Sequence, residues 1–218
     1  MNIELVVFDW DGTVVDSTLT IAEAIRQSCA DLGLPVPSLQ EASFVIGLGL
    51  HDALAHVAPG LSPSQVNALT DRYRHHYLSR DQFLTPFEGI RELLDALTAR
   101  RLPLAVATGK SRAGLERAFD ATRTRHYFVD SRCADESVPK PSPDMLLELC
   151  EAQAVDPSRV LMIGDTTHDI GMAQAAGAHA VAVSYGAHDR QRLEEAKPLV
   201  IMDSVPSLSS WVLERVSQ

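Results

Sequence analysis

Cysteine, positive charge and long apolar runs are all scarce in this chain of 218 residues. Its three cysteines, Cys29, Cys133 and Cys150, are too few and too scattered for a disulfide framework or a CxxC metal site. We therefore expect reduced, packed thiols and a cytoplasmic protein. No apolar run approaches the roughly 18 residues of a membrane span. The chain also starts without a basic region, an apolar signal core or a cleavage site, so we expect no membrane partner.

Acidic residues outnumber basic ones: 29 Asp and Glu against 19 Lys and Arg give a formal net charge of −10. This balance argues against a nucleic-acid partner, because binding to phosphate backbones needs clustered positive charge. It also constrains any anionic substrate. A site for one would need local positive potential from a metal ion, a lysine or helix N-termini.

The first candidate site follows the apolar run Leu5–Phe8, which is typical of a buried strand. Asp9 and Asp11 come next, and they lie on the same side while the backbone stays extended. Gly12 permits a bend, so both carboxylates can lie at the strand's carboxyl end, where open α/β sheets bind ligands. Two close carboxylates repel each other unless a cation or a proton lies between them. The pair therefore indicates a divalent metal site, an acid/base pair or both, with an ordinary Asp-Gly turn as the structural alternative.

Downstream, short apolar runs alternate with helical patterns, which predicts the α/β class: a Rossmann-like parallel sheet with helices on both faces. The stretch 16–85 carries helical patterns and no convincing strand, so we expect an all-helical cap inserted between core segments 1–15 and 86–218. The expected strands are 5–8, 104–108, 128–131, 160–164, 180–183 and 199–201. The expected helices are 16–32, 38–45, 50–56, 62–79, 90–100, 111–119, 142–152, 168–176, 188–196 and 206–216. Ser17 or Thr18 is expected to cap the first of these helices, and Ser142 the helix at 142–152.

Three further polar clusters occur at predicted strand ends or helix starts. Thr108 and Gly109 lie between a strand and a helix, which suits a phosphate held by a hydroxyl and backbone amides. Lys140 precedes a proline-initiated helix, where a cation is unfavourable unless an anion lies between it and the helix end. Asp165 and Asp169 follow the next buried strand and can share one face of a helical turn. A capping threonine, a solvated lysine and capping aspartates are the plain alternatives.

The stretch Phe8–Ser17 (FDWDGTVVDS) resembles the signature of the haloacid dehalogenase superfamily, and more narrowly its phosphoglycolate-phosphatase-like branch. Thr108, Lys140 and Asp165 match that family's other motifs in order, so the resemblance spans almost the whole chain. It implies that these residues converge at one edge of the core sheet. It also implies that the helical insert is a mobile cap.

The resemblance also implies the catalytic roles. Asp9 is expected to attack phosphorus and become an aspartyl phosphate. Asp11 is expected to protonate the leaving oxygen and then to deprotonate the hydrolytic water. Thr108, the Gly109 amide and Lys140 are expected to hold the transferring oxygens.

Magnesium is the cofactor that these motifs predict, because a few hard oxygen ligands with room for phosphate and waters suit it better than calcium or zinc. By the resemblance, a carboxylate oxygen of Asp9, the backbone carbonyl of Asp11 and Asp165 bind the ion. Asp169 supports the metal's waters or Lys140. His168 is expected to face solvent or the substrate entrance.

The cap segment has little of the positive charge that a highly charged anionic substrate would need. No lysine or arginine occurs between Arg26 and Arg72, so only histidines could bring positive charge there, His51 and His56. The loop Gly47–Gly49 could instead bind a small leaving group through backbone amides, with a plain turn as the alternative. Trp10 stands where many relatives carry leucine, and we expect it to pack beside the site.

The sequence predicts a magnesium-dependent phosphomonoester hydrolase acting on a small ester such as phosphoglycolate. A phosphosugar mutase and a pyrophosphatase of the same superfamily are alternatives, and a non-catalytic phosphate-binding module is another. A dehalogenase is disfavoured, because it needs neither a metal nor an acid at position 11. The expected partner is the small-molecule ester alone, and the protein is expected to be a monomer or a homodimer.

Overall fold

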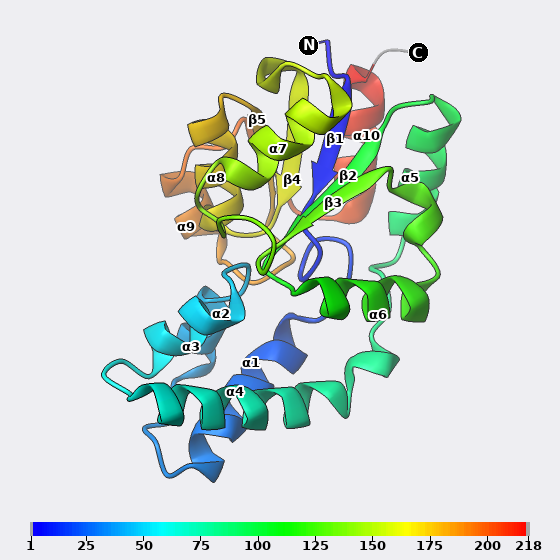
Figure 1. Cartoon of the computed structure of the whole chain (residues 1–218). Helices are drawn as coiled ribbons and strands as arrows, with labels where there is room; N and C mark the ends of the chain where they lie inside the picture. The colour runs from blue at the N-terminus through cyan, green and yellow to red at the C-terminus, as the bar shows by residue number, and fades with distance from the viewer. Residues whose placement is uncertain (1, 217–218) are drawn as a thin grey trace.

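The computed structural model describes residues 2–216 and contains one parallel six-stranded sheet flanked by helices (Figure 1). The strand order is β3-β2-β1-β4-β5-β6, so β1 lies near the middle and the order reverses between β1 and β4. The strands are β1 (Leu5–Phe8), β2 (Leu104–Thr108), β3 (Asp130–Cys133), β4 (Val160–Gly164), β5 (His179–Val183) and β6 (Val200–Met202). The predicted α/β class and parallel sheet are confirmed. In open sheets of this kind, ligands bind beyond the carboxyl ends of the strands at the reversal.

Ten α-helices and three 3-10 turns accompany the sheet within the described residues. The helices are α1 (Thr18–Asp31), α2 (Leu39–Phe44), α3 (Leu50–Val57), α4 (Pro63–Leu78), α5 (Ile90–Ala99), α6 (Arg112–Thr122), α7 (Asp144–Gln153), α8 (Thr167–Ala176), α9 (Arg190–Glu195) and α10 (Val205–Arg215). The 3-10 turns are Asp81–Phe83, Arg125–Tyr127 and Pro157–Arg159. No helix in residues 2–216 combines the length and the apolar character needed to cross a bilayer.

The side chains of β1 point alternately to the two faces of the sheet, and each face has its own hydrophobic core. Val6 and Phe8 pack on the face covered by α5 and α10, whereas Leu5 and Val7 pack on the face covered by α7 and α8. All four side chains are fully buried, as expected for a central parallel strand. This packing fixes the direction in which the chain leaves the strand at Asp9.

Helices α1 to α4 form a separate layer below the carboxyl ends of the strands (Figure 1) and bury their own apolar cluster. The chain leaves and rejoins the sheet side by side: the Asp16 amide donates to Thr85 O over 3.1 Å, and the Phe87 amide donates to Val14 O over 3.0 Å. The division at 15/16 and 85/86 stays a prediction, and this paired crossing supports it. We refer to 16–85 below as the cap segment.

Three local predictions were wrong. The third strand begins at Asp130 rather than 128, because a 3-10 turn at Arg125–Tyr127 delays pairing until Asp130 lies beside Ala105. Helix α7 begins at Asp144 without a side-chain cap. The Ser142 hydroxyl donates to Asp144 instead.

The first-helix cap is also different. Ser17 occupies the N-cap position of α1 but makes no capping hydrogen bond, because its hydroxyl donates to Asp11 Oδ1 over 2.7 Å. A residue expected to end a helix therefore contacts a candidate catalytic carboxylate.

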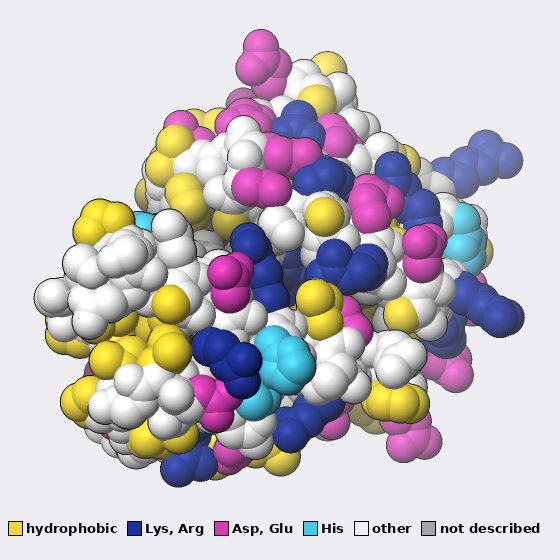
Figure 2. All heavy atoms as spheres, turned by 60° about the horizontal axis from the view of Figure 1, so that its bottom comes forward, with side chains coloured by type: hydrophobic (Ala, Val, Ile, Leu, Met, Phe, Trp, Pro, Cys, Tyr) yellow, Lys and Arg dark blue, Asp and Glu magenta, His cyan; other side chains and the backbone are white. Residues whose placement is uncertain are grey.

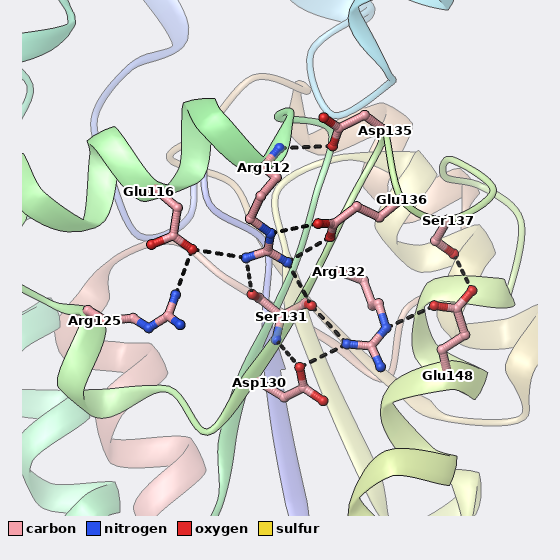
Figure 3. Close-up of polar contacts among 10 residues, drawn as sticks. All are labelled: Arg112, Glu116, Arg125, Asp130, Ser131, Arg132, Asp135, Glu136, Ser137 and Glu148. Carbon is pink, nitrogen blue, oxygen red and sulfur yellow. Dashed lines mark hydrogen bonds and ion pairs between the residues drawn. The ribbon is translucent and has the colours of Figure 1, made fainter.

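Charged side chains cover the exposed edge of the sheet at β3 (Figure 3). Arg132 pairs with Asp130 and Glu148, which blunts an edge that could otherwise pair with another strand. Arg112, at the start of α6, forms two hydrogen bonds with Glu136 over 2.9 and 2.7 Å. This pair fastens the loop that leads to Lys140 to the helix that follows Thr108.

Candidate active site

The carboxyl ends of β1 and β4 bring three aspartates and one lysine together. Oxygen atoms of Asp9, Asp165 and Asp169 lie within 4.8 Å of one another, and all three side chains are buried. Lys140 Nζ lies 2.7 Å from Asp9 Oδ1 and 2.6 Å from Asp169 Oδ1. These four residues are 4 to 160 positions apart along the chain, and parallel pairing of β1 with β4 brings the ends of their segments to one edge of the sheet.

Burial sets the electrostatics of this cluster. It raises the pKa of Asp9 well above its ordinary value, with Lys140 opposing the effect and the two other carboxylates reinforcing it. Burial, and then Asp169, raise the pKa of Asp165 to about 7. Burial alone would lower the pKa of Lys140, but Asp169 and Asp9 outweigh it and raise that pKa. One ammonium group therefore faces three carboxylates, which leaves an excess of negative charge in a desolvated place.

A divalent cation fits this donor set. Asp9 Oδ2 is buried and contacts no hydrogen-bond donor among the described residues. An unpartnered buried oxygen is costly unless a ligand satisfies it. Three carboxylates supply the hard oxygens that magnesium prefers, and too few of them for a calcium cage. The residues present thus match the predicted cofactor.

Glycines at positions 12 and 186 leave the space that the Asp165 carboxylate occupies in the cluster. A Cβ atom at Gly12 or at Gly186 would lie 2.2 Å from Asp165 Oδ2, so neither position accepts a side chain without displacing the carboxylate. Thr13 Oγ1 donates to Asp165 Oδ1 over 2.9 Å, and the Ala187 amide donates to Oδ2 over 2.6 Å. The turn after β1 therefore orients the aspartate at the end of β4.

Asp11 lies outside the three-aspartate cluster. Its Oδ1 accepts from Ser17, and its Oδ2 lies 3.1 Å from Lys110 Nζ. Asp11 is only 7% exposed and lines a cavity of about 590 Å³ between the sheet and the cap segment. Asp9 and Asp11 thus have separate environments, as two different chemical roles require.

Thr108 and Gly109 form the third side of the site. Thr108 is fully buried, and its Oγ1 accepts from the Lys110 amide over 3.2 Å. A Cβ atom at Gly109 would lie 2.3 Å from Leu48 O and 2.7 Å from Gly47 O. Glycine is therefore required at 109 because the cap loop closes directly onto it.

The cap loop Gly47–Gly49 reaches the site, as predicted, and lines the cavity. Its amides at Gly47 and Gly49 donate to no group among residues 2–216, so they stay available to a ligand. The same loop presents the carbonyls of Gly47 and Leu48 to Gly109. A role for these amides in binding the leaving group stays a prediction.

The cavity contains more positive charge than the cap sequence alone indicates. The exposed His51 lines it, whereas His56 packs beside the Phe44 ring at 5.5 Å and is not among the lining residues. Arg74, Lys110 and Arg117 also line it. Figure 2 views this face, where basic side chains lie beside the hollow between the two layers. The expectation that only histidines bring positive charge concerned residues 27–71 alone, and the further cations come from α4 and from the sheet layer.

His168 neither faces solvent nor lines the cavity, so the prediction that it faces solvent or the substrate entrance was wrong. It is 9% exposed, and its Nε2 donates to the Phe44 carbonyl over 3.0 Å. His188 Nε2 donates to the same carbonyl over 2.9 Å, and its Nδ1 accepts from the Thr167 amide. The His188 and Phe44 rings stack at 5.1 Å. We call this contact between cap and sheet layer the histidine clasp.

Trp10 packs beside the site, and this prediction is confirmed. Its side chain is fully buried and meets Phe119 edge to face at 5.1 Å and Phe128 at 6.1 Å. The indole fills the space under the turn that carries Asp9 and Asp11. All three cysteines are free and buried, as expected for packed thiols.

Two residues with clear contacts in the site were not singled out from the sequence. Lys110 belongs to the Thr-Gly-Lys turn, but nothing in the sequence told it apart from a solvated lysine. Tyr77, from α4, accepts a hydrogen bond from Lys110 over 2.7 Å. Its helical spacing with Val66, Leu69 and Tyr73 on the buried face of α4 was the one available signal.

Comparison with known proteins identifies the family. The family model described as haloacid dehalogenase-like hydrolase matches residues 6–183. This chain belongs to that family. A probable phosphatase, IndB, of Dickeya dadantii is 34% identical, with 92% of this chain and 89% of the relative covered. A phosphoglycolate phosphatase of Thiobacillus denitrificans is 30% identical, with 98% and 96% covered.

Solved structures give the same fold. A hydrolase from Pseudomonas syringae superposes with a TM-score of 0.90 at 22% identity, with all of both chains covered. A predicted phosphoglycolate phosphatase from Haemophilus somnus superposes with a TM-score of 0.86 at 25% identity, with 97% of this chain and 99% of that one covered. The family membership predicted from the motifs is thereby confirmed.

Proposed function

We propose that this chain is a magnesium-dependent phosphomonoester hydrolase that works through an aspartyl phosphate on Asp9. The observation that carries the proposal is that the two oxygens of the Asp9 carboxylate have different surroundings. Lys140 holds its Oδ1 at 2.7 Å, while its buried Oδ2 contacts no donor among the described residues. A carboxylate fixed at one oxygen and free at the other is prepared to act as a nucleophile.

In the first half-reaction, a carboxylate oxygen of Asp9 forms a bond to phosphorus as the bond from phosphorus to the leaving oxygen breaks. Asp11, held by Ser17, gives its proton to that oxygen, so the alcohol departs neutral. In the second half-reaction, Asp11 takes a proton from water as the water oxygen bonds to phosphorus. The bond between phosphorus and Asp9 breaks, which restores the carboxylate and releases inorganic phosphate.

The remaining residues position the phosphoryl group. We assign Thr108, the Gly109 amide and Lys140 to its oxygens, where they stabilise developing charge. A carboxylate oxygen of Asp9, the Asp11 carbonyl and Asp165 would hold magnesium, and Asp169 would hold Lys140 in place. When bound, the ion supplies positive charge that offsets the clustered carboxylates and polarises the phosphoryl group.

Phosphoglycolate is the substrate we propose, as a representative small ester. Several relatives bear the name phosphoglycolate phosphatase, which supports the assignment. The cavity of about 590 Å³ admits much larger leaving groups, so its size does not select glycolate by itself. A cytoplasmic location and a monomeric or homodimeric state remain predictions.

The test is phosphate release from para-nitrophenyl phosphate by the full chain, with magnesium and with a chelator. We expect turnover that needs magnesium and that disappears in Asp9→Asn. A protein that binds phosphate esters without releasing phosphate would instead be the non-catalytic alternative. Turnover that is equal in the presence of the chelator would contradict the metal assignment.

A further inference from the structure

Lys110 is the least exposed cation on the wall of the leaving-group cavity within the described residues. Its side chain is 9% exposed, whereas the side chains of Arg74 and Arg117 on the same wall are 61% and 51% exposed and pair with Asp71 and Asp81. Exposed ion pairs contribute little, because water screens them. A negatively charged group bound in the cavity would therefore interact more strongly with Lys110 than with Arg74 or Arg117.

The contacts of Lys110 leave donors unused. An ammonium group offers three N–H donors. Nζ donates one hydrogen bond, to Tyr77 Oη over 2.7 Å, and lies 3.1 Å from Asp11 Oδ2 as an ion pair. Tyr77 accepts that bond, and its own proton goes to no group in the part of the chain that the structure describes. At least one ammonium hydrogen and a phenol hydrogen thus remain unused beside the cavity.

The position of these donors fixes which part of a substrate they can reach. Asp11 must lie within hydrogen-bond distance of the leaving oxygen to protonate it. Lys110 Nζ lies 3.1 Å from the same carboxylate. Lys110 Nζ therefore lies within about 6 Å of the leaving oxygen, and an acceptor bound to it lies within about 9 Å, three hydrogen-bond lengths. A carboxylate on the carbon that bears the ester oxygen lies within this distance.

We propose that Lys110 and Tyr77 form a subsite for a carboxylate of the leaving group, placed two or three bonds from the ester oxygen. This subsite rests on the proposed phosphatase function and adds the chemical class of the substrate: the phosphate ester of a 2-hydroxy carboxylic acid. The rest of the cavity wall is largely apolar, with Ile21, Ile25 and Val45, so charge recognition is concentrated at Lys110. Phosphoglycolate is the smallest ester of this class.

The test compares two esters of nearly equal size, 2-phosphoglycolate and isobutyl phosphate, which differ in the carboxylate. We expect wild type to prefer 2-phosphoglycolate in kcat/KM. Lys110→Met should lower kcat/KM for 2-phosphoglycolate about 10- to 100-fold more than for isobutyl phosphate, the value of a charge-assisted hydrogen bond, and mainly through KM. Tyr77→Phe, which removes one hydroxyl, should act in the same direction by a smaller factor. Lys110→Arg should recover part of the preference.

The control is Lys197→Met, which removes the same charge at an exposed position away from the site and should leave both esters unaffected. Equal losses on both esters in Lys110→Met would overturn the subsite and assign Lys110 to positioning Asp11 alone. A wild type without preference for the carboxylate would also overturn it. Calorimetric binding of 2-phosphoglycolate to Asp9→Asn, with and without Lys110→Met, separates the two proposals. Lys110-dependent binding without turnover in wild type would sustain the subsite while the phosphatase proposal fails.

Discussion

The two walls of the active-site cavity are built differently. On the sheet side, Asp9, Lys140 and Asp169 are at most 2% exposed and meet at 2.6 and 2.7 Å. On the cap side, the wall is a loop of small residues, two tyrosines and exposed charges, with His51 78% exposed. The charged groups on the sheet side are buried and held by fixed partners, whereas the charged groups on the cap side are exposed and can change position.

This contrast assigns catalysis to the sheet side of the cavity and substrate selection to the cap side. Buried groups with fixed partners can stabilise charge as it develops, because little reorganisation is needed. The phosphoryl group is common to all candidate substrates, so the sheet side need not vary with the leaving group. Discrimination then depends on the cap side and on contacts that join it to the sheet layer, among them Lys110–Tyr77 and the histidine clasp. Substitutions on the two sides should therefore have different kinetic signatures.

The largest effect should come from Asp9→Asn. This change removes the nucleophile at nearly constant volume, so we expect the rate of phosphate release to fall about 10⁴-fold or more. Circular dichroism and thermal unfolding should show an intact fold. Steady-state activity within tenfold of wild type would show that the sheet side does not carry the chemistry through Asp9.

Asp11→Asn should slow both half-reactions, by about 10²- to 10⁴-fold for an ester with a poor leaving group. A good leaving group needs little acid assistance, so the first half-reaction should then outrun the second and an aspartyl phosphate should accumulate. Rapid-quench labelling with para-nitrophenyl phosphate measures this intermediate. The assigned role of Asp11 is wrong if no protein-bound phosphate forms with any leaving group.

Asp165→Ala should raise the magnesium concentration needed for half-maximal activity about tenfold or more, because one of few protein ligands is lost. A magnesium titration at saturating substrate measures the change. The matched control is Asp156→Ala, which removes an exposed carboxylate that holds only Ser158. An unchanged titration would leave Asp165 with only a structural part in the loop between β4 and α8.

The sheet side was predictable from sequence for a physical reason. Asp9, Thr108 and Asp165 each end or directly follow a short apolar run, and buried runs of this kind form parallel strands whose carboxyl ends meet at one edge. Asp9 and Asp165 needed no knowledge of side-chain packing to be placed together. The order β2-β1-β4 in the sheet then brings Thr108 to the same edge.

The cap contacts could not be predicted in this way. Tyr77 and Lys110 are 33 positions apart, and Phe44 and His188 are 144 apart. Whether they meet depends on how one helical layer rests on another, which no periodicity encodes. Ser17 shows the same limit at short range, because its hydroxyl can cap a helix or hold Asp11, and only the folded turn decides between them.

The histidine clasp should affect stability more than chemistry. Burial lowers the pKa of His188, so the folded state favours the neutral ring. Below the unfolded pKa of about 6.5, the unfolded chain takes up a proton that the folded chain resists, and stability falls with decreasing pH. We expect His188→Gln to lower the free energy of unfolding at pH 7.5 by about 1–2 kcal/mol and to weaken this acid-dependent loss. Urea unfolding between pH 5.0 and 7.5 measures both, with the exposed His126→Gln as control. A variant with the wild-type pH dependence would exclude His188 as its source.

The smallest effect should come from the cap loop at Gly49. Its backbone is extended, with φ −60° and ψ 143°, so any residue can adopt it and a substitution acts only through contacts. A Cβ atom there would lie 3.4 Å from Ala134 Cβ and from Pro139 Cγ, so alanine fits but a longer side chain must push the loop away. We expect Gly49→Ala to stay within about twofold of wild type. Gly49→Leu should raise KM for the best substrate about three- to tenfold, with less effect on para-nitrophenyl phosphate, because only the cap side is displaced. Steady-state kinetics on both esters provides the measurement. Equal losses on both, or a fall confined to kcat, would show that the loop serves the chemistry rather than the selection, and the division of labour between the two walls would not hold.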